Sequence, residues 1–168
     1  LNDGRLAVGL GDRVVIGAGR DAAVTVTIDV VEGRKLTAVT ALYPALDGGL
    51  LICDGSKSYS CDDWAWDLMS NNKDGRLVAV DAEGGNARVL ASGLGYSYGA
   101  YESPETGVLV SESWKHQLSQ IVGKGAGVAI DRLPGYPCRF APADDGGFWL
   151  SLFCSRTQLV EFVLKEHD

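Results

Sequence analysis

Side chains capable of acid–base or anion-binding chemistry gather in a few polar and aromatic stretches of the sequence. Glu112 and His116 stand close together in SESWKHQ (111–117) and form the candidate catalytic pair. A carboxylate can act as a general base, and an imidazole can transfer protons near neutral pH. Arg139 can hold a carboxylate or phosphate of a ligand through paired hydrogen bonds. The candidates for substrate binding are Tyr98, Arg139, Tyr136, Asp54 and Trp114.

Each candidate also has a purely structural interpretation. Glu112 could accept backbone hydrogen bonds from the next loop, and His116 could be a structural hydrogen-bonding residue. Arg139 could form a salt bridge with Glu112 or Asp54 and close a channel. Trp114 could pack between sheets, and Asp54 could shape a turn. The sequence leaves these alternatives open.

Other common site chemistries find little support. There is no Ser-His-Asp order and no nucleophile elbow, so a serine nucleophile is not indicated. The four cysteines include no CxxC pair and there are only 2 histidines, which disfavours a structural zinc site. A Cys53–Cys61 bridge is possible, although buried free thiols are common in apolar strands. We expect no cofactor and no metal.

A repeated pattern carries these residues. Each copy is a strand of about six residues, a turn ending in glycine, and a strongly apolar strand. The copies occupy residues 37–56, 93–114 and 136–155. The glycines that precede an apolar strand are Gly4, Gly48, Gly107 and Gly147. With an insertion at 57–73 set aside, their spacing is close to the roughly 40–45 residues of a four-stranded propeller blade.

The repeat predicts an all-β fold: a β-propeller of four-stranded antiparallel blades, with roughly three and a half blades present. Residues 1–168 form one partial domain. Its blade parts are 1–30, 36–93, 96–133 and 137–165, with three, four, four and three strands. An ordinary β-sandwich with the same turn spacing is the alternative.

Propeller topology predicts where the site lies. Let A to D denote the strands of a blade from the axis outward. The A–B and C–D turns then fall on one face and are short and glycine-bearing, whereas the B–C and D–A loops share the other face and carry most Trp, Tyr, Arg and His residues. Within the insertion, Asp62 or Asp63 can cap a short helix over 63–70. This helix is either a plug over the channel or a substrate lid.

Composition limits the classes of partner. Apolar residues make up 46% of the chain, which argues against disorder. The formal charge is −7 and no basic patch stands out, so neither nucleic acid nor an anionic membrane is an expected partner. No apolar run approaches the roughly 18 residues needed to span a membrane. The chain shows no signal-peptide pattern and does not begin with Met, so we expect a fragment and a cytoplasmic location.

Several motifs together carry a family resemblance. They are LLICDGS, WDLM, DGRLVAVD, GLGYSYG, VLVSESWKHQL, LPGYPCRF, DGGFWLSLF and RTQLVEFVLKE, and the resemblance spans roughly residues 37–168. The combination ESWKH, LPGYP and DGGFW is specific, whereas any one piece alone is weak. With these motifs the chain resembles the strictosidine synthase-like group, which is related to the senescence-marker/gluconolactonase six-bladed propellers. A complete propeller of this group is about twice as long.

The resemblance has consequences for the site. Metal-dependent relatives hold a divalent cation with Asn, Asp and Glu at the axial ends of the inner strands. The corresponding positions here are Tyr98-Gly99 and Cys138-Arg139, which do not suit a hard cation. No position here matches the catalytic glutamate of strictosidine synthase, which lies in a late blade.

Two functions follow as hypotheses. The first is a metal-independent hydrolase or lyase acting on a small organic molecule, with Glu112 as acid–base catalyst. The second is a propeller that binds a small ligand or a protein without chemistry. A half-ring would also leave blade faces bare, so we expect self-association through ring closure or strand exchange.

Overall fold

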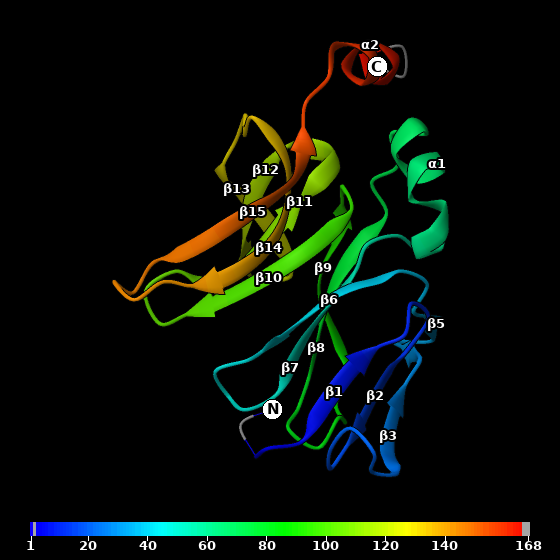
Figure 1. The fold of residues 1–168 in the computed structure, drawn as a ribbon, viewed down its shortest axis with the longest axis vertical. Coiled ribbons are helices and arrows are strands. Elements are labelled where there is room, and N and C mark those ends of the chain that lie inside the picture. Colours follow the sequence, from blue (N-terminus) through cyan, green and yellow to red (C-terminus); the bar gives the residue numbers. More distant parts are fainter. Residues whose placement is uncertain (2, 166–168) are drawn as a thin grey trace.

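The computed structural model describes residue 1 and residues 3–165 (Figure 1). Its strands form antiparallel sheets, each following the chain order. The first sheet contains β1 (Leu6–Gly9), β2 (Val14–Gly17) and β3 (Val24–Ile28), and a hairpin of β4 (Val30–Val31) and β5 (Arg34–Lys35) follows. The second contains β6 (Val39–Pro44), β7 (Leu50–Asp54), β8 (Gly75–Val80) and β9 (Arg88–Leu94). The third contains β10 (Ser97–Ser103), β11 (Gly107–Glu112), β12 (Gln117–Val122) and β13 (Gly125–Ile130), and the last contains β14 (Gly135–Pro142) and β15 (Phe148–Ser155).

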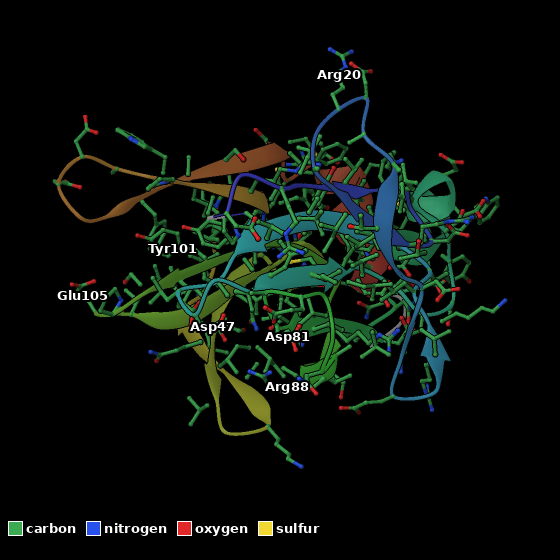
Figure 2. All side chains as sticks on the ribbon, turned by 90° about the horizontal axis from the view of Figure 1, so that it is seen from below. Arg20, Asp47, Asp81, Arg88, Tyr101 and Glu105 are labelled. Carbon is green, nitrogen blue, oxygen red and sulfur yellow. The ribbon has the colours of Figure 1, made fainter. Side chains whose placement is uncertain are left out.

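The sheets are arranged as blades around an axis. The inner strands β6, β10 and β14 of successive blades contact one another, and β1 of the first blade packs against β6. Short hairpins with glycine turns join strands one and two of each blade, and Asp47, Asp81 and Glu105 in these and the related turns are labelled in Figure 2. The fold is therefore a β-propeller, of which the described residues form an arc.

The core explains why the central strands are continuous apolar runs. Every residue of β7 and of β8 is buried. Leu50 and Ile52 of β7 pack toward the first blade, in a cluster with Val14 and Ile16. The alternate residues of β7, including Leu51, pack toward the third blade. Because each face of the second blade is covered by a neighbouring blade, both faces of its strands are apolar.

Helices α1 (Trp64–Met69) and α2 (Gln158–Lys165) follow strands β7 and β15 and lie at the same end of the molecule (Figure 1). Helix α1 (Trp64–Met69) follows η1 (Cys61–Asp63) within the predicted insertion. The expected capping is not observed, because the Asp63 carboxylate accepts from the Ser60 hydroxyl and not from the helix backbone. Within the described residues, no helix is long and apolar enough to cross a bilayer.

The prediction of a third strand at the end of blade part 137–165 is wrong. Residues Gln158–Lys165 form helix α2, so β14 and β15 pair alone. As a helix, Val160 and Leu164 share one face and pack against Leu68, Tyr96, Trp114 and Tyr136. A local run of apolar residues does not distinguish the two structures, because this distant aromatic cluster decides between them. Of the four turn glycines named from the sequence, Gly4, Gly48 and Gly107 have a positive φ. In the last turn the residue with a positive φ is Gly146, which precedes Gly147.

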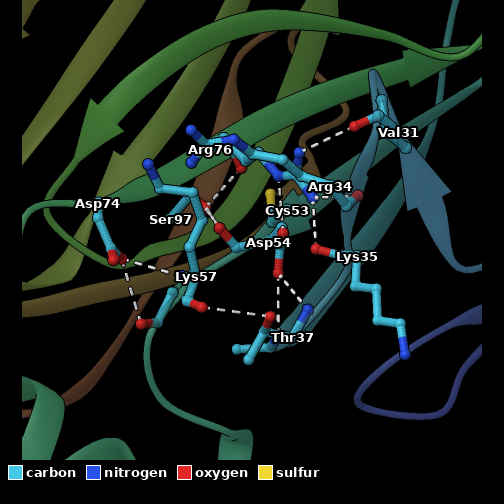
Figure 3. Close-up of polar contacts among 12 residues, drawn as sticks. Val31, Arg34, Lys35, Thr37, Cys53, Asp54, Lys57, Asp74, Arg76 and Ser97 are labelled. Carbon is cyan, nitrogen blue, oxygen red and sulfur yellow. Dashed lines mark hydrogen bonds and ion pairs between the residues drawn. The ribbon is translucent and has the colours of Figure 1, made fainter.

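A buried ion pair ties the second blade to the segment before it (Figure 3). The Asp54 carboxylate accepts from Arg76 Nε at 2.8 Å, and their side chains are 0% and 2% exposed. The same carboxylate accepts the amides of Thr37 and Ala38. The Arg76 guanidinium also donates to the Val31 carbonyl and to those of Arg34 and Lys35. Asp54, expected to bind substrate or shape a turn, is thus held inside the fold.

Polar groups dock α2 beside its apolar contacts. His116 Nε2 lies 3.4 Å from Glu161 Oε1, and Arg156 pairs with the other Glu161 oxygen. Three buried atoms lack a hydrogen-bond partner within the described residues: His116 Nε2, Tyr136 Oη and Glu161 Oε1. Burial raises the pKa of Tyr136 to about 12, so its phenol stays protonated. Burial and Arg156 lower the pKa of His116, although Glu161 opposes this.

Arg76→Met should destabilise the fold by about 3 kcal/mol, because it leaves the Asp54 carboxylate buried without its countercharge. Arg13→Met removes a pair with Asp12 whose side chains are 49% and 59% exposed, and it should leave stability nearly unchanged, because solvent screens the pair. Chemical denaturation of both variants measures the difference. Equal losses of unfolding free energy in the two variants would show that the buried pair contributes no more to stability than the exposed one.

Docking of α2 should weaken as the pH falls. The docked pKa of His116 is below its ordinary value of 6.5, so protonation favours the undocked helix below about that pH. The bond from Arg156 holds the pKa of Glu161 below 4.5, so its contribution is lost only at lower pH. Hydrogen exchange of the α2 amides, corrected for intrinsic rates, should show two losses of protection as the pH falls. The upper one follows protonation of His116 and the lower one follows protonation of Glu161. His116→Asn should remove only the upper step, and a flat wild-type profile from pH 7.5 to 5 would contradict it.

We propose that the 168-residue chain self-associates, because both ends of the arc expose large apolar side chains. Trp149 of β15, in the last blade, is 73% exposed, and Val24 of β3, in the first blade, is 55% exposed. Two chains closing one ring, or exchanging strands at the end blades, would cover such surfaces. Sedimentation at micromolar concentration should therefore detect a dimer or larger species, and a monomer would refute the proposal.

Candidate functional site

Aromatic side chains line a cavity of about 220 Å³ at the face carrying the B–C and D–A loops. We call it the aromatic pocket; its residues are Val39, Thr40, Cys61, Trp64, Tyr96, Tyr98, Trp114, Arg139 and Phe153. A second cavity of about 270 Å³, the axial cavity, lies along the inner strands. The two share Val39, Thr40 and Arg139, so Arg139 stands between them.

Close packing of two inner strands brings the pocket residues together. A Cβ on Gly99 would lie 2.2 Å from the Cys138 carbonyl oxygen, so only glycine allows β10 to approach β14 this closely. The Ser111 hydroxyl donates to the same carbonyl at 2.6 Å. These contacts place Tyr98, which precedes Gly99, beside Arg139, which follows Cys138. The Arg139 guanidinium carbon is 5.8 Å from the centre of the Tyr98 ring.

Two further contacts hold the aromatic wall. Tyr96 has a left-handed backbone with φ of 58°, and its ring stacks on Trp114 with centroids 4.4 Å apart. A bulky residue rarely adopts this conformation, so the loop holds Tyr96 against a conformational cost. The Trp114 indole N–H donates at 2.6 Å to the buried carboxylate of Asp67 on α1. Helix α1 and the wall are thereby joined, and Trp64 of α1 completes the rim.

Arg139 keeps most of its hydrogen-bonding capacity. Its Nη2 donates to the Thr40 carbonyl at 3.0 Å. Neither expected carboxylate partner pairs with it, because Asp54 is bound to Arg76 and Glu112 to Lys115. A guanidinium has five N–H donors, so several remain for another group.

Glu112 lies outside the pocket lining and is fully engaged. Its oxygens accept from the Gly95 amide at 2.8 Å and from the side chains of Lys115, Gln117 and Ser119. Burial alone would raise the pKa of Glu112, but the bonds from Lys115, Ser119 and Gly95 outweigh it and hold that pKa below its usual value. A general base needs a free oxygen near the substrate and a pKa near the working pH. The arrangement leaves no such oxygen and joins β11 to the loop before β10.

The structure separates the predicted residues into two groups. Tyr98, Trp114 and Arg139 line the aromatic pocket. His116 and Tyr136 lie under α2, with their ring centroids 4.6 Å apart and with Tyr136 behind Trp114. Asp54 and Glu112 are buried in hydrogen-bond networks outside the pocket.

The sequence did not single out several pocket residues. They are Val39, Thr40, Cys61, Trp64, Tyr96 and Phe153. Trp64 lies in the predicted insertion, and Tyr96 lies in the same GLGYSYG loop as Tyr98. The sequence therefore indicated the loops that carry these two residues but not the residues themselves. Phe153 ends an apolar strand, and nothing local distinguishes it from core. Burial raises the pKa of Cys61 and of Tyr96, so both stay protonated.

The side chains at the axial ends of the inner strands do not fit a divalent cation. Tyr98 and Arg139 face the cavity, and the Cys138 thiol lies 3.3 Å from the Ser151 hydroxyl. A guanidinium repels a cation, and a thiol is a poor ligand for hard ions. Among the described residues, no three His, Cys, Asp or Glu side chains gather into a metal-binding group.

Comparison with known proteins agrees with the fold and names a family. The family model for strictosidine synthase matches residues 45–124. The bovine adipocyte plasma membrane-associated protein is 31% identical over 133 residues, which are 75% of this chain and 32% of the relative. Strictosidine synthase-like protein 6 of Arabidopsis thaliana is 28% identical, over 80% of this chain and 37% of the relative. The chain thus spans about a third of these curated relatives.

The solved structures agree. A proposed gluconolactonase superposes with a TM-score of 0.67 at 16% identity, over 89% of this chain and 54% of that structure. At this identity the likeness concerns the fold, and it places the blades of the present chain within a propeller. The motifs, the family model and the relatives together show that the chain is similar to the strictosidine synthase-like family, and the solved structures show that its fold is that of a β-propeller.

Proposed function

We propose that this chain supplies a binding pocket for a small organic molecule, on the propeller face that carries the B–C and D–A loops. The observation that carries the proposal is the convergence of α1, β10, η2 (Ser113–Lys115), β14 and β15 on one aromatic pocket. Ligand sites are concave, mostly apolar, and contain a few placed polar groups. Within the described residues, the aromatic pocket fits this description.

Binding without chemistry by this part of the chain is the better-supported function. Both carboxylate oxygens of Glu112, the proposed acid–base catalyst, accept hydrogen bonds from structural partners, and His116 lies under α2. Cys61 and Tyr96, which do line the pocket, have raised pKa values because of burial and are poor bases at neutral pH. A hydrolase or lyase activity of the whole protein would need its acid–base group from elsewhere in the polypeptide.

A screen of small organic molecules against the complete polypeptide tests both functions. Trp114→Ala should weaken every ligand of the pocket by about tenfold or more, because it removes the ring on which Tyr96 stacks. Trp66→Ala, which removes a 68% exposed ring outside the pocket lining, should leave affinity unchanged. Calorimetry gives the affinities.

Glu112→Gln separates binding from catalysis. We expect it to lower stability, because Lys115 loses its ion pair, and to leave ligand affinity intact. Loss of turnover in a folded Glu112→Gln protein would restore the enzymatic hypothesis. Ligands that bind equally well to the Trp114→Ala variant would place the site elsewhere.

A further inference from the structure

We infer that the aromatic pocket selects planar aromatic carboxylates and rejects aromatic amines. This inference rests on the proposed function and specifies its ligand class. It combines two features of the pocket, the unpaired guanidinium of Arg139 and the aromatic rings that surround it.

The charge of the ligand follows from Arg139, the one ionised side chain in the part of the lining that the structure describes. Arg139 contributes the positive charge, and its one hydrogen bond among the described residues is to a neutral carbonyl, that of Thr40. Among the residues that the structure describes, no Asp or Glu lines the pocket. The chain as a whole carries −7, so a positive site here is a local feature and not part of a basic surface.

The geometry of Arg139 suits a carboxylate. Its position 5.8 Å from the centre of the Tyr98 ring and its bond to Thr40 restrain the guanidinium before any ligand arrives. A restrained planar fork matches the two oxygens of a carboxylate. A ligand ammonium would instead meet a like charge in a pocket without a compensating acid.

The flat part of the ligand follows from the arrangement of the rings. Trp64 meets Phe153 edge to face at 5.4 Å, and Phe153 lies 6.3 Å from Tyr98. Trp64 also lies 6.4 Å from Trp114. These rings come from separate elements and leave a cavity of about 220 Å³, smaller than the sites of drug-sized ligands. A ring system of one or two fused rings can stack or pack edge to face there.

Four matched probes test the inference on the complete polypeptide by calorimetry at pH 7.5. They are 2-naphthoate, its neutral amide 2-naphthamide, the cationic 2-naphthylmethylamine, and the non-aromatic cyclohexanecarboxylate. The naphthoate should bind at least tenfold more tightly than each of the other three. A tenfold difference in affinity corresponds to the contribution of one charge-assisted hydrogen bond.

Variants assign the preference to particular residues. Arg139→Met should abolish the difference between naphthoate and naphthamide, and Arg139→Lys should keep part of it. Trp64→Ala should weaken both naphthalene ligands. The controls are Arg132→Met, at an 88% exposed side chain, and Trp66→Ala, at a ring on the same helix that is 68% exposed. Both should leave the affinities unchanged.

The outcomes separate this inference from the proposed function. If naphthamide or the amine binds as tightly as naphthoate, the ligand class is wrong although the pocket exists. If naphthoate does not bind while the broader screen yields Trp114-dependent ligands, the inference again fails alone. A preference for naphthoate that survives Arg139→Met would assign the anion site to another residue and overturn the argument.

Discussion

The buried pair of Asp54 and Arg76 fixes the point from which the second blade and its neighbours are built. Both side chains are almost fully buried, and each also binds backbone groups of the segment that enters the blade. An isolated buried charge is costly, so the pair and its backbone contacts must form together. Because Thr37 and Ala38 are held by Asp54, the start of β6 is placed, and with it Thr40 on the wall of the pocket.

Backbone carbonyls, more than side-chain pairs, connect the blades. Ser97 donates to the carbonyls of Asp54 and Arg76, and Thr40 donates to that of Ser97. Ser111 repeats this between the third and last blades. Such contacts depend on small hydroxyl residues and do not use the Arg139 guanidinium, most of whose donors stay free on the loop face. The ligand preference can therefore reside in Arg139 and the aromatic rings alone.

The sequence was informative where the signal was local or repeated. Turn glycines and doubly apolar strands predicted the blades, because burial on two faces leaves a continuous hydrophobic run. The same topology placed Tyr98, Trp114 and Arg139 at one mouth. Partners distant in sequence could not be predicted: Glu112 is held by Gly95, and α2 is a helix because of the aromatic cluster that it covers. Phe153 became a pocket residue only because the fold brings this part of β15 beside Trp64 of α1 and Tyr98 of β10.

The pocket is assembled from pieces far apart along the polypeptide, since Thr40 and Arg139 are 99 positions apart. During translation its first wall leaves the ribosome well before the last one, and the nascent chain must keep the early aromatic residues soluble meanwhile. Non-local contacts of this kind close slowly. Ligand recognition is consequently among the last properties that this arc can acquire as it matures.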